Sequence, residues 1–140
     1  MVANMFHNPP DDVIRAILSK PRRIAVVGCS PDPRRDSNRI ARLLQERRHT
    51  VVPVNPLVTT ILGQPCYPTL QAIPDPVEMV DIFRRADHAG AVVDDAIAVG
   101  ARIVWMQLGV VDERAANRAL AAGLTVVMDR CPAIEYRRLW

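Results

Sequence analysis

Aromatic residues and glycines are scarce in this sequence. Of the 140 residues only six are aromatic and six are glycine, and the aromatic residues are scattered along the chain. The scatter provides no stacking platform of the kind that holds single-stranded nucleic acids. The formal net charge is only +3, too small an excess to attract a polyanion. The sequence therefore predicts no nucleic-acid partner.

Cysteine is scarce too, because the chain has three cysteines and no C-x-x-C pair. An odd number without such a pair argues against a disulfide framework and against a zinc site. No apolar run approaches the roughly 20 residues that span a bilayer, so we expect no membrane partner. Residues 1–12 contain no basic stretch followed by an apolar one, so we expect no secretory signal and a cytoplasmic location.

Nearly all basic residues of the chain are arginines. Lys20 is the single lysine, and the other 17 basic residues are arginines, whose guanidinium groups bind phosphate in a bidentate manner. The length is that of about one average domain. We predict an N-terminal arm over residues 1–10 and one domain over residues 11–140.

Five short apolar runs alternate with amphipathic segments. The segments begin at capping residues such as Asp36 or Ser37 and Asp112, which predicts helices. Strands that are apolar throughout are buried on both faces, so the sheet is expected to be parallel with helices on each side. We predict a single α/β, Rossmann-like, doubly wound five-stranded sheet of order 3-2-1-4-5, with the flavodoxin-like order 2-1-3-4-5 left open. The predicted strands are 24–27, 51–54, 77–83, 103–106 and 124–128.

The first predicted strand ends at a loop typical of phosphate binding. In an open parallel sheet the ligand lies beyond the carboxyl ends of the strands. Gly28 directly follows the first strand and precedes a loop and a helix start, where backbone N–H groups hold phosphate. Arg34, Arg35 and Arg39 lie in or beside this loop and could neutralise the phosphate charge.

The loop nevertheless differs from a dinucleotide fingerprint. Ser30 and Pro33 stand where G-x-G-x-x-G requires glycine. Asn55, rather than an acidic residue for a ribose hydroxyl, follows the second strand. The site therefore suits a nucleotide phosphate without being built for NAD, and the arginines leave NADP open.

Catalytic groups are poorly represented at the strand ends. His7 lies in the arm, His49 precedes the second strand and His88 lies at a helix start. No G-x-S-x-G elbow and no pair of nucleophile and base can be named. We expect a protein that binds its ligand without catalysing a reaction.

Seven segments, taken in order, make the sequence recognisable: 24–30, 52–56, 61–63, 67–68, 80–85, 105–110 and 126–132. They cover almost all of residues 11–140. With them the chain resembles the small stand-alone CoA-binding proteins of bacteria, a family similar to the N-terminal CoA-binding domain of the succinyl-CoA synthetase α subunit.

The resemblance implies that CoA or an acyl-CoA binds along the strand ends. The loop after Gly28 would meet the pyrophosphate, Asn55 and Pro56 would flank the adenosine, and Cys131 would lie near the thiol. With the loop arginines, the predicted CoA-binding residues are Gly28, Cys29, Ser30, Arg34, Arg35, Ser37, Asn55, Pro56, Phe83, Arg84, Met106, Gln107, Leu108 and Cys131.

Ligase activity does not follow from the resemblance. The synthetase uses a phosphorylated histidine in a second domain and a partner subunit, and neither is present in this sequence. Two alternatives stay open: an NADP- or other nucleotide-dependent enzyme, and a CoA-linked redox regulator in which Cys29 or Cys131 forms a mixed disulfide with CoA. A homodimer or another protein partner is left open as well.

Overall fold

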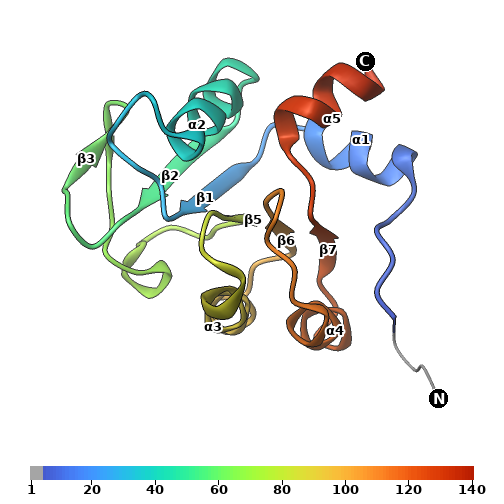
Figure 1. Ribbon diagram of the computed structural model, residues 1–140. Helices are drawn as coiled ribbons and strands as arrows, with labels where there is room; N and C mark the ends of the chain where they lie inside the picture. The colour runs from blue at the N-terminus through green and yellow to red at the C-terminus, as the bar shows by residue number, and fades with distance from the viewer. Residues whose placement is uncertain (1–4) are drawn as a thin grey trace.

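A parallel sheet of five strands forms the centre of the computed structural model, which describes residues 5–140. Each strand coincides with or overlaps one of the predicted apolar runs, and helices connect most of them, so the Rossmann-like α/β class is confirmed (Figure 1). The strands are β1 (Arg23–Val27), β2 (Thr50–Val54), β5 (Met79–Ile82), β6 (Ile103–Met106) and β7 (Thr125–Met128).

The order of the strands corrects one prediction. The sheet runs β2-β1-β5-β6-β7, so the five predicted strands lie in the order 2-1-3-4-5 and not 3-2-1-4-5. The position beyond β2 is taken by a single parallel bridge between Val54 and Tyr67. The order 3-2-1-4-5 is approached only if this bridge is counted as a rudimentary third strand. A small antiparallel pair, β3 (Thr60–Ile61) and β4 (Gln64–Pro65), precedes the bridge.

Pro53 lies within β2 because β2 is the last full strand on its side of the sheet. Proline has no N–H to donate to a ladder and is tolerated at sheet edges. The carbonyl oxygen of Pro53 accepts a hydrogen bond from the Tyr67 N–H at 3.1 Å. Since Tyr67 lies on the side away from β1, the missing donor of Pro53 faces outward and costs no bond to β1.

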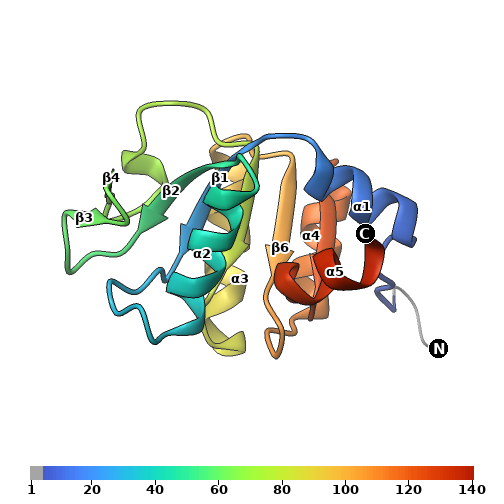
Figure 2. The same ribbon diagram turned by 90° about the horizontal axis from the view of Figure 1, so that it is seen from above.

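Helices cover both faces of the sheet (Figures 1 and 2). One face carries α1 (Asp11–Ser19), α2 (Asp36–Glu46) and α5 (Pro132–Leu139), and the other carries α3 (Ala86–Ala98) and α4 (Glu113–Ala121). A short 3-10 helix, η1, spans Leu70–Ala72. Within residues 5–140, no helix is both long enough and apolar enough to cross a membrane.

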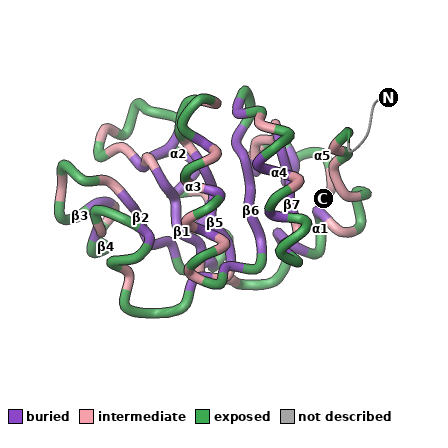
Figure 3. The backbone as a smooth tube through the Cα atoms, turned by 90° about the horizontal axis from the view of Figure 1, so that it is seen from below, coloured by how far each residue is buried: buried purple, intermediate pink, exposed green. Residues whose placement is uncertain are grey.

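Two apolar layers make up the core, one on each side of the sheet. The strands between them are largely buried (Figure 3). Ala25, Val80 and Val104 point toward α3 and α4, whereas Val26 and Trp105 point toward α1, α2 and α5. Successive strand residues point to opposite faces. Burial on both faces explains why the strands read as continuous apolar runs.

The helix starts agree with the predictions in part. Asp112 caps α4, because its side chain accepts a hydrogen bond from the Ala115 N–H at 3.0 Å. The predicted cap of α2 is wrong. Arg35 occupies the cap position without a side-chain bond, and Asp36 is already helical. The Ser37 hydroxyl, one residue further in, accepts from the N–H of Ser30 in the preceding loop instead.

Helix α5 is fixed beside α1 by buried polar contacts. His49 accepts a hydrogen bond from the Arg22 N–H, and its other ring nitrogen lies 2.9 Å from the Tyr136 hydroxyl. That hydroxyl donates to the carbonyl oxygen of Leu18 at the end of α1. These contacts hold α5 against the body of the fold, so that its first turn stays near α2.

Candidate functional site

Two adjoining cavities lie at the carboxyl ends of β1, β5, β6 and β7. One has a volume of about 610 Å³ and the other about 560 Å³, which is the usual range for small-molecule sites. Asp36, Arg39 and Phe83 line both of them. The two cavities therefore form one continuous groove with two ends of different chemistry.

The smaller cavity, of about 560 Å³, is polar and lies between the β1–α2 loop and Phe83. We call it the basic end, because it contains three arginines and one carboxylate. Its lining residues are Gly28, Ser30, Arg34, Arg35, Asp36, Ser37, Arg39 and Phe83.

Hydrogen bonds within the loop fix the shape of the basic end. The Ser37 hydroxyl accepts from the Ser30 N–H at 2.9 Å, and the Asn38 amide donates to the Ser30 carbonyl oxygen at 2.9 Å. The Ser30 hydroxyl accepts in turn from the Asp32 N–H at 3.0 Å. The loop is thus tied to the first turn of α2, where backbone N–H groups are free of intrahelical partners.

Gly28 is required at the start of this loop for two reasons. Its φ is +86°, a left-handed conformation that side chains rarely adopt. A Cβ atom at this position would also lie 2.2 Å from the carbonyl oxygen of Phe83. Glycine therefore lets the β1 and β5 strand ends approach each other closely, and this approach forms the floor of the basic end.

The three arginines of the basic end differ in what they already contact. Arg34 forms two hydrogen bonds to the Asp32 carboxylate, at 3.1 and 3.0 Å, and this contact lowers the pKa of Asp32. Arg39 is paired with Asp36. Within residues 5–140, the Arg35 guanidinium has no hydrogen bond or ion pair, so it is available to a ligand.

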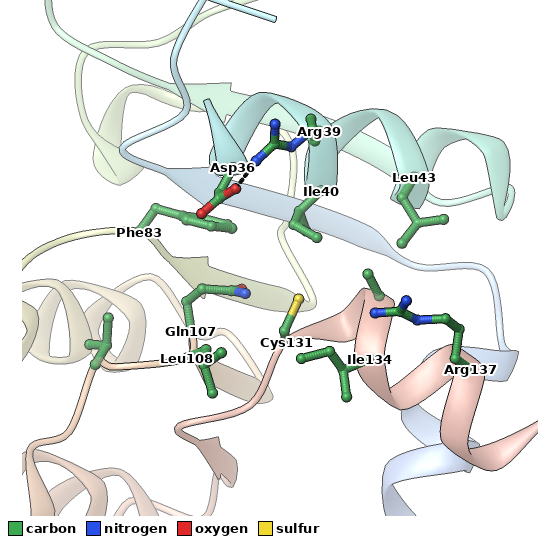
Figure 4. Close-up of a pocket in the computed structure, with 12 residues that line it drawn as sticks. Asp36, Arg39, Ile40, Leu43, Phe83, Gln107, Leu108, Cys131, Ile134 and Arg137 are labelled. Carbon is green, nitrogen blue, oxygen red and sulfur yellow. Dashed lines mark hydrogen bonds and ion pairs between the residues drawn. The ribbon is translucent and has the colours of Figure 1, made fainter. Parts of the chain in front are cut away.

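The larger cavity, of about 610 Å³, is mainly apolar and lies between α2 and α5 (Figure 4). We call it the apolar end. Ile40 and Leu43 of α2 face Ile134 of α5 across it. Gln107 after β6 and Cys131 after β7 supply polar groups at its base. Its remaining lining residues are Asp36, Arg39, Phe83, Leu108, Val110, Ala133 and Arg137.

Gln107 carries an unsatisfied polar atom at the apolar end. The residue is 7% exposed, and its Oε1 atom is buried without a hydrogen-bond partner. Its amide points toward Cys131 (Figure 4). A buried acceptor without a partner costs about 1–3 kcal/mol, so a ligand with an N–H or O–H group would be favoured here.

The groove brings together nine of the fourteen predicted site residues. They come from loops that are far apart in the sequence and meet only because parallel strands end at one edge. These nine are Gly28, Ser30, Arg34, Arg35, Ser37, Phe83, Gln107, Leu108 and Cys131.

Five predicted residues do not line either cavity. The Cys29 side chain is buried in the core. Asn55 uses its amide within the fold, because it donates to the Cys29 carbonyl oxygen at 2.9 Å and accepts from the Leu57 N–H at 2.8 Å. Met106 points into the core on the α3 side. The other two, Pro56 and Arg84, are exposed outside the cavities.

The list of predicted CoA-binding residues omits eight lining residues, which are Asp36, Arg39, Ile40, Leu43, Val110, Ala133, Ile134 and Arg137. Of these, Arg39 is predicted beside the phosphate loop without being included in that list. Most lie on α2 and α5. Arg39, Ile40 and Leu43 follow one another at spacings of one and three residues, so one face of α2 presents them together. That spacing was visible in the sequence, but the return of α5 over the sheet was not.

Two further ionisable groups, Asp81 and Cys29, are buried in the core. Asp81 on β5 is fully buried between Val26 and Trp105 of the neighbouring strands, and neither carboxylate oxygen has a hydrogen-bond partner. Burial raises the pKa of Asp81 well above its usual value. Burial also raises the pKa of the Cys29 thiol to about 12, with smaller contributions from Cys66 and Asp81.

Metal binding finds no support in the described part of the chain. Residues 5–140 contain no group of three or more His, Cys, Asp or Glu side chains that could hold an ion. The groove instead offers arginines, a helix start and an apolar end. Such a combination suits an organic ligand that carries phosphate.

Three relatives are similar to this chain over most of its length. The uncharacterized protein YneT of Bacillus subtilis is 35% identical over 131 residues, which cover 94% of this chain and 97% of YneT. A hypothetical protein from Pyrococcus horikoshii is 39% identical in a solved structure, with a TM-score of 0.88 and coverage of 96% and 99%.

The third relative is a larger enzyme. An acetyl-coenzyme A synthetase from Ca. Korarchaeum cryptofilum is 27% identical with a TM-score of 0.70, and the match covers 82% of this chain but only 28% of the synthetase. Residues 22–137 match the family described as the CoA binding domain. The chain therefore belongs to the CoA binding domain family and is homologous to the CoA-binding part of larger synthetases of this type.

Proposed function

We propose that the protein binds CoA or an acyl-CoA in the groove and does not transform it. The observation that carries this proposal is the division of one continuous groove into a basic end and an apolar end. CoA has the same division, since a phosphorylated nucleotide is joined to a long, weakly polar arm that contains amides and ends in a thiol.

The basic end suits the phosphates of CoA. The Arg35 guanidinium forms no hydrogen bond or ion pair within residues 5–140, although its charge helps to lower the pKa of Asp32. Arg39 lies at the junction of the two cavities. Asp36 and Ser37 at the start of α2 line the same cavity, and helix N-termini bind phosphate through backbone N–H groups and through the helix dipole. Arginine also offers bidentate contacts to phosphate oxygens.

The apolar end suits the arm of CoA. Ile40, Leu43 and Ile134 provide apolar walls for its methyl and methylene groups. The unpaired Oε1 atom of Gln107 would accept a hydrogen bond from one of its amide N–H groups. An acyl group on the sulfur would lie in the same apolar surroundings.

The end of β2 lacks the features of an NADP site. A dinucleotide site places a ribose at this point, and NADP sites add a basic residue there for the 2′-phosphate. Residues 55–60 contain no charged side chain, and the Asn55 amide is already used by the Cys29 carbonyl oxygen and the Leu57 N–H. The arginines lie in the β1–α2 loop instead.

The polar groups of the groove support binding rather than catalysis. The groove has one carboxylate, Asp36, and it is paired with Arg39. The hydroxyls of Ser30 and Ser37 accept hydrogen bonds within the loop. No histidine is among its lining residues within the described chain. This leaves no pair of base and nucleophile in position.

Calorimetric titration of the reduced protein with CoA, acetyl-CoA and NADP tests the proposal. We expect saturable binding of CoA and acetyl-CoA with one site per chain, and no saturable heat with NADP. Binding should weaken as salt is raised, because arginine–phosphate contacts are screened. Saturable binding of NADP without binding of CoA would overturn the proposal in favour of a nucleotide-dependent enzyme.

A further inference from the structure

Of the three cysteines, Cys131 is the one whose sulfur faces the groove (Figure 4). It follows β7 and occupies the cap position of α5. Cys29 and Cys66 are buried in the core, and burial raises the pKa of both thiols. A thiol exchanges with disulfides through its thiolate and only where the partner can reach it. Of the three, Cys131 has the required access.

A second observation at the same place points to a ligand. Gln107 is only 7% exposed, and its Oε1 atom has no hydrogen-bond partner. Its side-chain amide points toward the Cys131 sulfur. It calls for a ligand with an N–H donor close to Cys131. The arm of CoA has an amide N–H two carbons from its thiol, so one bound arm would place its sulfur near Cys131 while satisfying Gln107.

We propose that Cys131 captures the thiol end of a bound CoA-type ligand as a reversible mixed disulfide. This inference rests on the proposed function and adds a means of regulation to the same site. The mixed disulfide would keep the groove occupied under oxidising conditions and would release CoA on reduction. It also distinguishes Cys131 from Cys29, which the sequence had left as equal candidates.

The reaction needs CoA disulfide as its second reactant. The Cys131 thiolate attacks one sulfur of CoA disulfide. The bond between the two CoA sulfurs breaks, and a bond forms between Cys131 Sγ and one CoA sulfur. The other CoA leaves as a thiolate and takes a proton from water. The Cys131 sulfur is oxidised from a thiol to a disulfide sulfur, and the sulfur of the departing CoA is reduced from a disulfide to a thiol. A small thiol such as dithiothreitol reverses the step.

The experiment is intact-mass analysis of the reduced full-length protein after incubation with CoA disulfide. We expect one CoA adduct per chain, removed by dithiothreitol and located on Cys131 by peptide mapping. Cys131→Ser should lose the adduct, and the matched control Cys66→Ala should keep it. Because mapping of the wild-type chain identifies the cysteine directly, the result does not depend on the folding of either variant.

Two further arms show whether the groove directs the reaction. Glutathione disulfide should react at least about tenfold more slowly than CoA disulfide, because a bound reactant has a raised effective concentration. Acetyl-CoA has no free thiol, and its occupation of the groove should slow adduct formation. Equal rates for the two disulfides, or no effect of acetyl-CoA, would mean a merely accessible thiol and would overturn the inference.

The two proposals fail in distinguishable ways. Titration with CoA in dithiothreitol measures binding without any disulfide. Saturable binding there, together with no adduct or an adduct on Cys29, would overturn the role of Cys131 and leave the proposed function standing. No saturable binding there would overturn both proposals.

Discussion

Replacement of Gly28 by alanine should destabilise the protein more than a backbone effect alone explains. The left-handed φ of +86° costs a residue with a Cβ atom roughly 1–2 kcal/mol. The added Cβ atom would lie 2.2 Å from the Phe83 carbonyl oxygen and 3.0 Å from its carbonyl carbon. Both are backbone atoms, so no side-chain rotation relieves the contact.

The strand ends around Gly28 cannot separate without losing hydrogen bonds. The Gly28 N–H donates to the Val54 carbonyl oxygen at 3.0 Å, and the Phe83 N–H donates to the Val27 carbonyl oxygen at 2.8 Å. Overpacking of a well-packed site costs about 1–3 kcal/mol. We therefore expect Gly28→Ala to lower the free energy of unfolding by roughly 2–5 kcal/mol.

Gly100→Ala is the matched control. Its φ is +81°, and no atom lies within 4 Å of the position of its added Cβ. It should cost only the backbone portion, roughly 1–2 kcal/mol. Urea unfolding of both variants, followed by circular dichroism, gives the comparison. Equal losses in the two variants would refute the close approach of β1 and β5 at Gly28.

Three other changes test separate parts of the account. Arg35→Ala should weaken CoA binding, measured by calorimetry, by about tenfold, because it removes a charge-assisted contact worth about 1.5 kcal/mol. Arg84→Ala, which lies outside the groove, should leave the affinity for CoA unchanged. Equal effects of the two substitutions would contradict the assignment of the basic end. Gln107→Leu should raise the free energy of unfolding of the ligand-free protein in urea by about 1–3 kcal/mol, because it removes an unpaired buried acceptor. The same substitution should weaken CoA binding. A destabilised variant with normal affinity for CoA would count against the role of Gln107 as a ligand acceptor. Burial raises the pKa of Asp81, so the folded chain holds a proton that the unfolded chain releases above pH 3.8. The free energy of unfolding of the wild type, relative to that of Asp81→Asn, should therefore fall as pH rises from there, by up to about 1.4 kcal/mol per pH unit until the folded carboxyl ionises. Parallel pH profiles of the two proteins would show that this carboxyl is not buried.

The fold class could be predicted because burial on both sides leaves a strong pattern in the sequence. Strand β6 is apolar throughout and β1 is apolar after Arg23. Glycines close α3 and α4 at Gly100 and Gly123. The strand order could not be predicted in the same way. A buried strand has the same apolar composition whichever strand pairs with it, so β5 gave no indication that it pairs with β1 on the side opposite β2.

The site could be predicted as an edge of the sheet but not as a groove. The strand-end rule selected Gly28, Phe83 and Gln107, which all line it. The family resemblance added Met106, although neighbouring strand residues point to opposite faces and Met106 lies in the core. The wall from α5 required knowledge of the tertiary contacts made by Tyr136, which no local pattern contains.

Asn55 shows why position alone does not assign a role. It lies at the end of β2, where a nucleotide-binding protein often contacts a ribose. Its side chain instead joins the β1 and β2 loops through Cys29 and Leu57. Only the hydrogen-bond partners distinguish a residue that positions a loop from one that faces the ligand.

Mapping of backbone amide NMR shifts during titration with CoA tests the central claim most directly. It reports both whether CoA binds and where it lies. The account predicts saturable shifts concentrated in the β1–α2 loop, at Phe83, in residues 107–110 and in the first turn of α5, with little change near η1 at the opposite edge of the strands. Shifts centred on η1, or no saturable shifts, would contradict it.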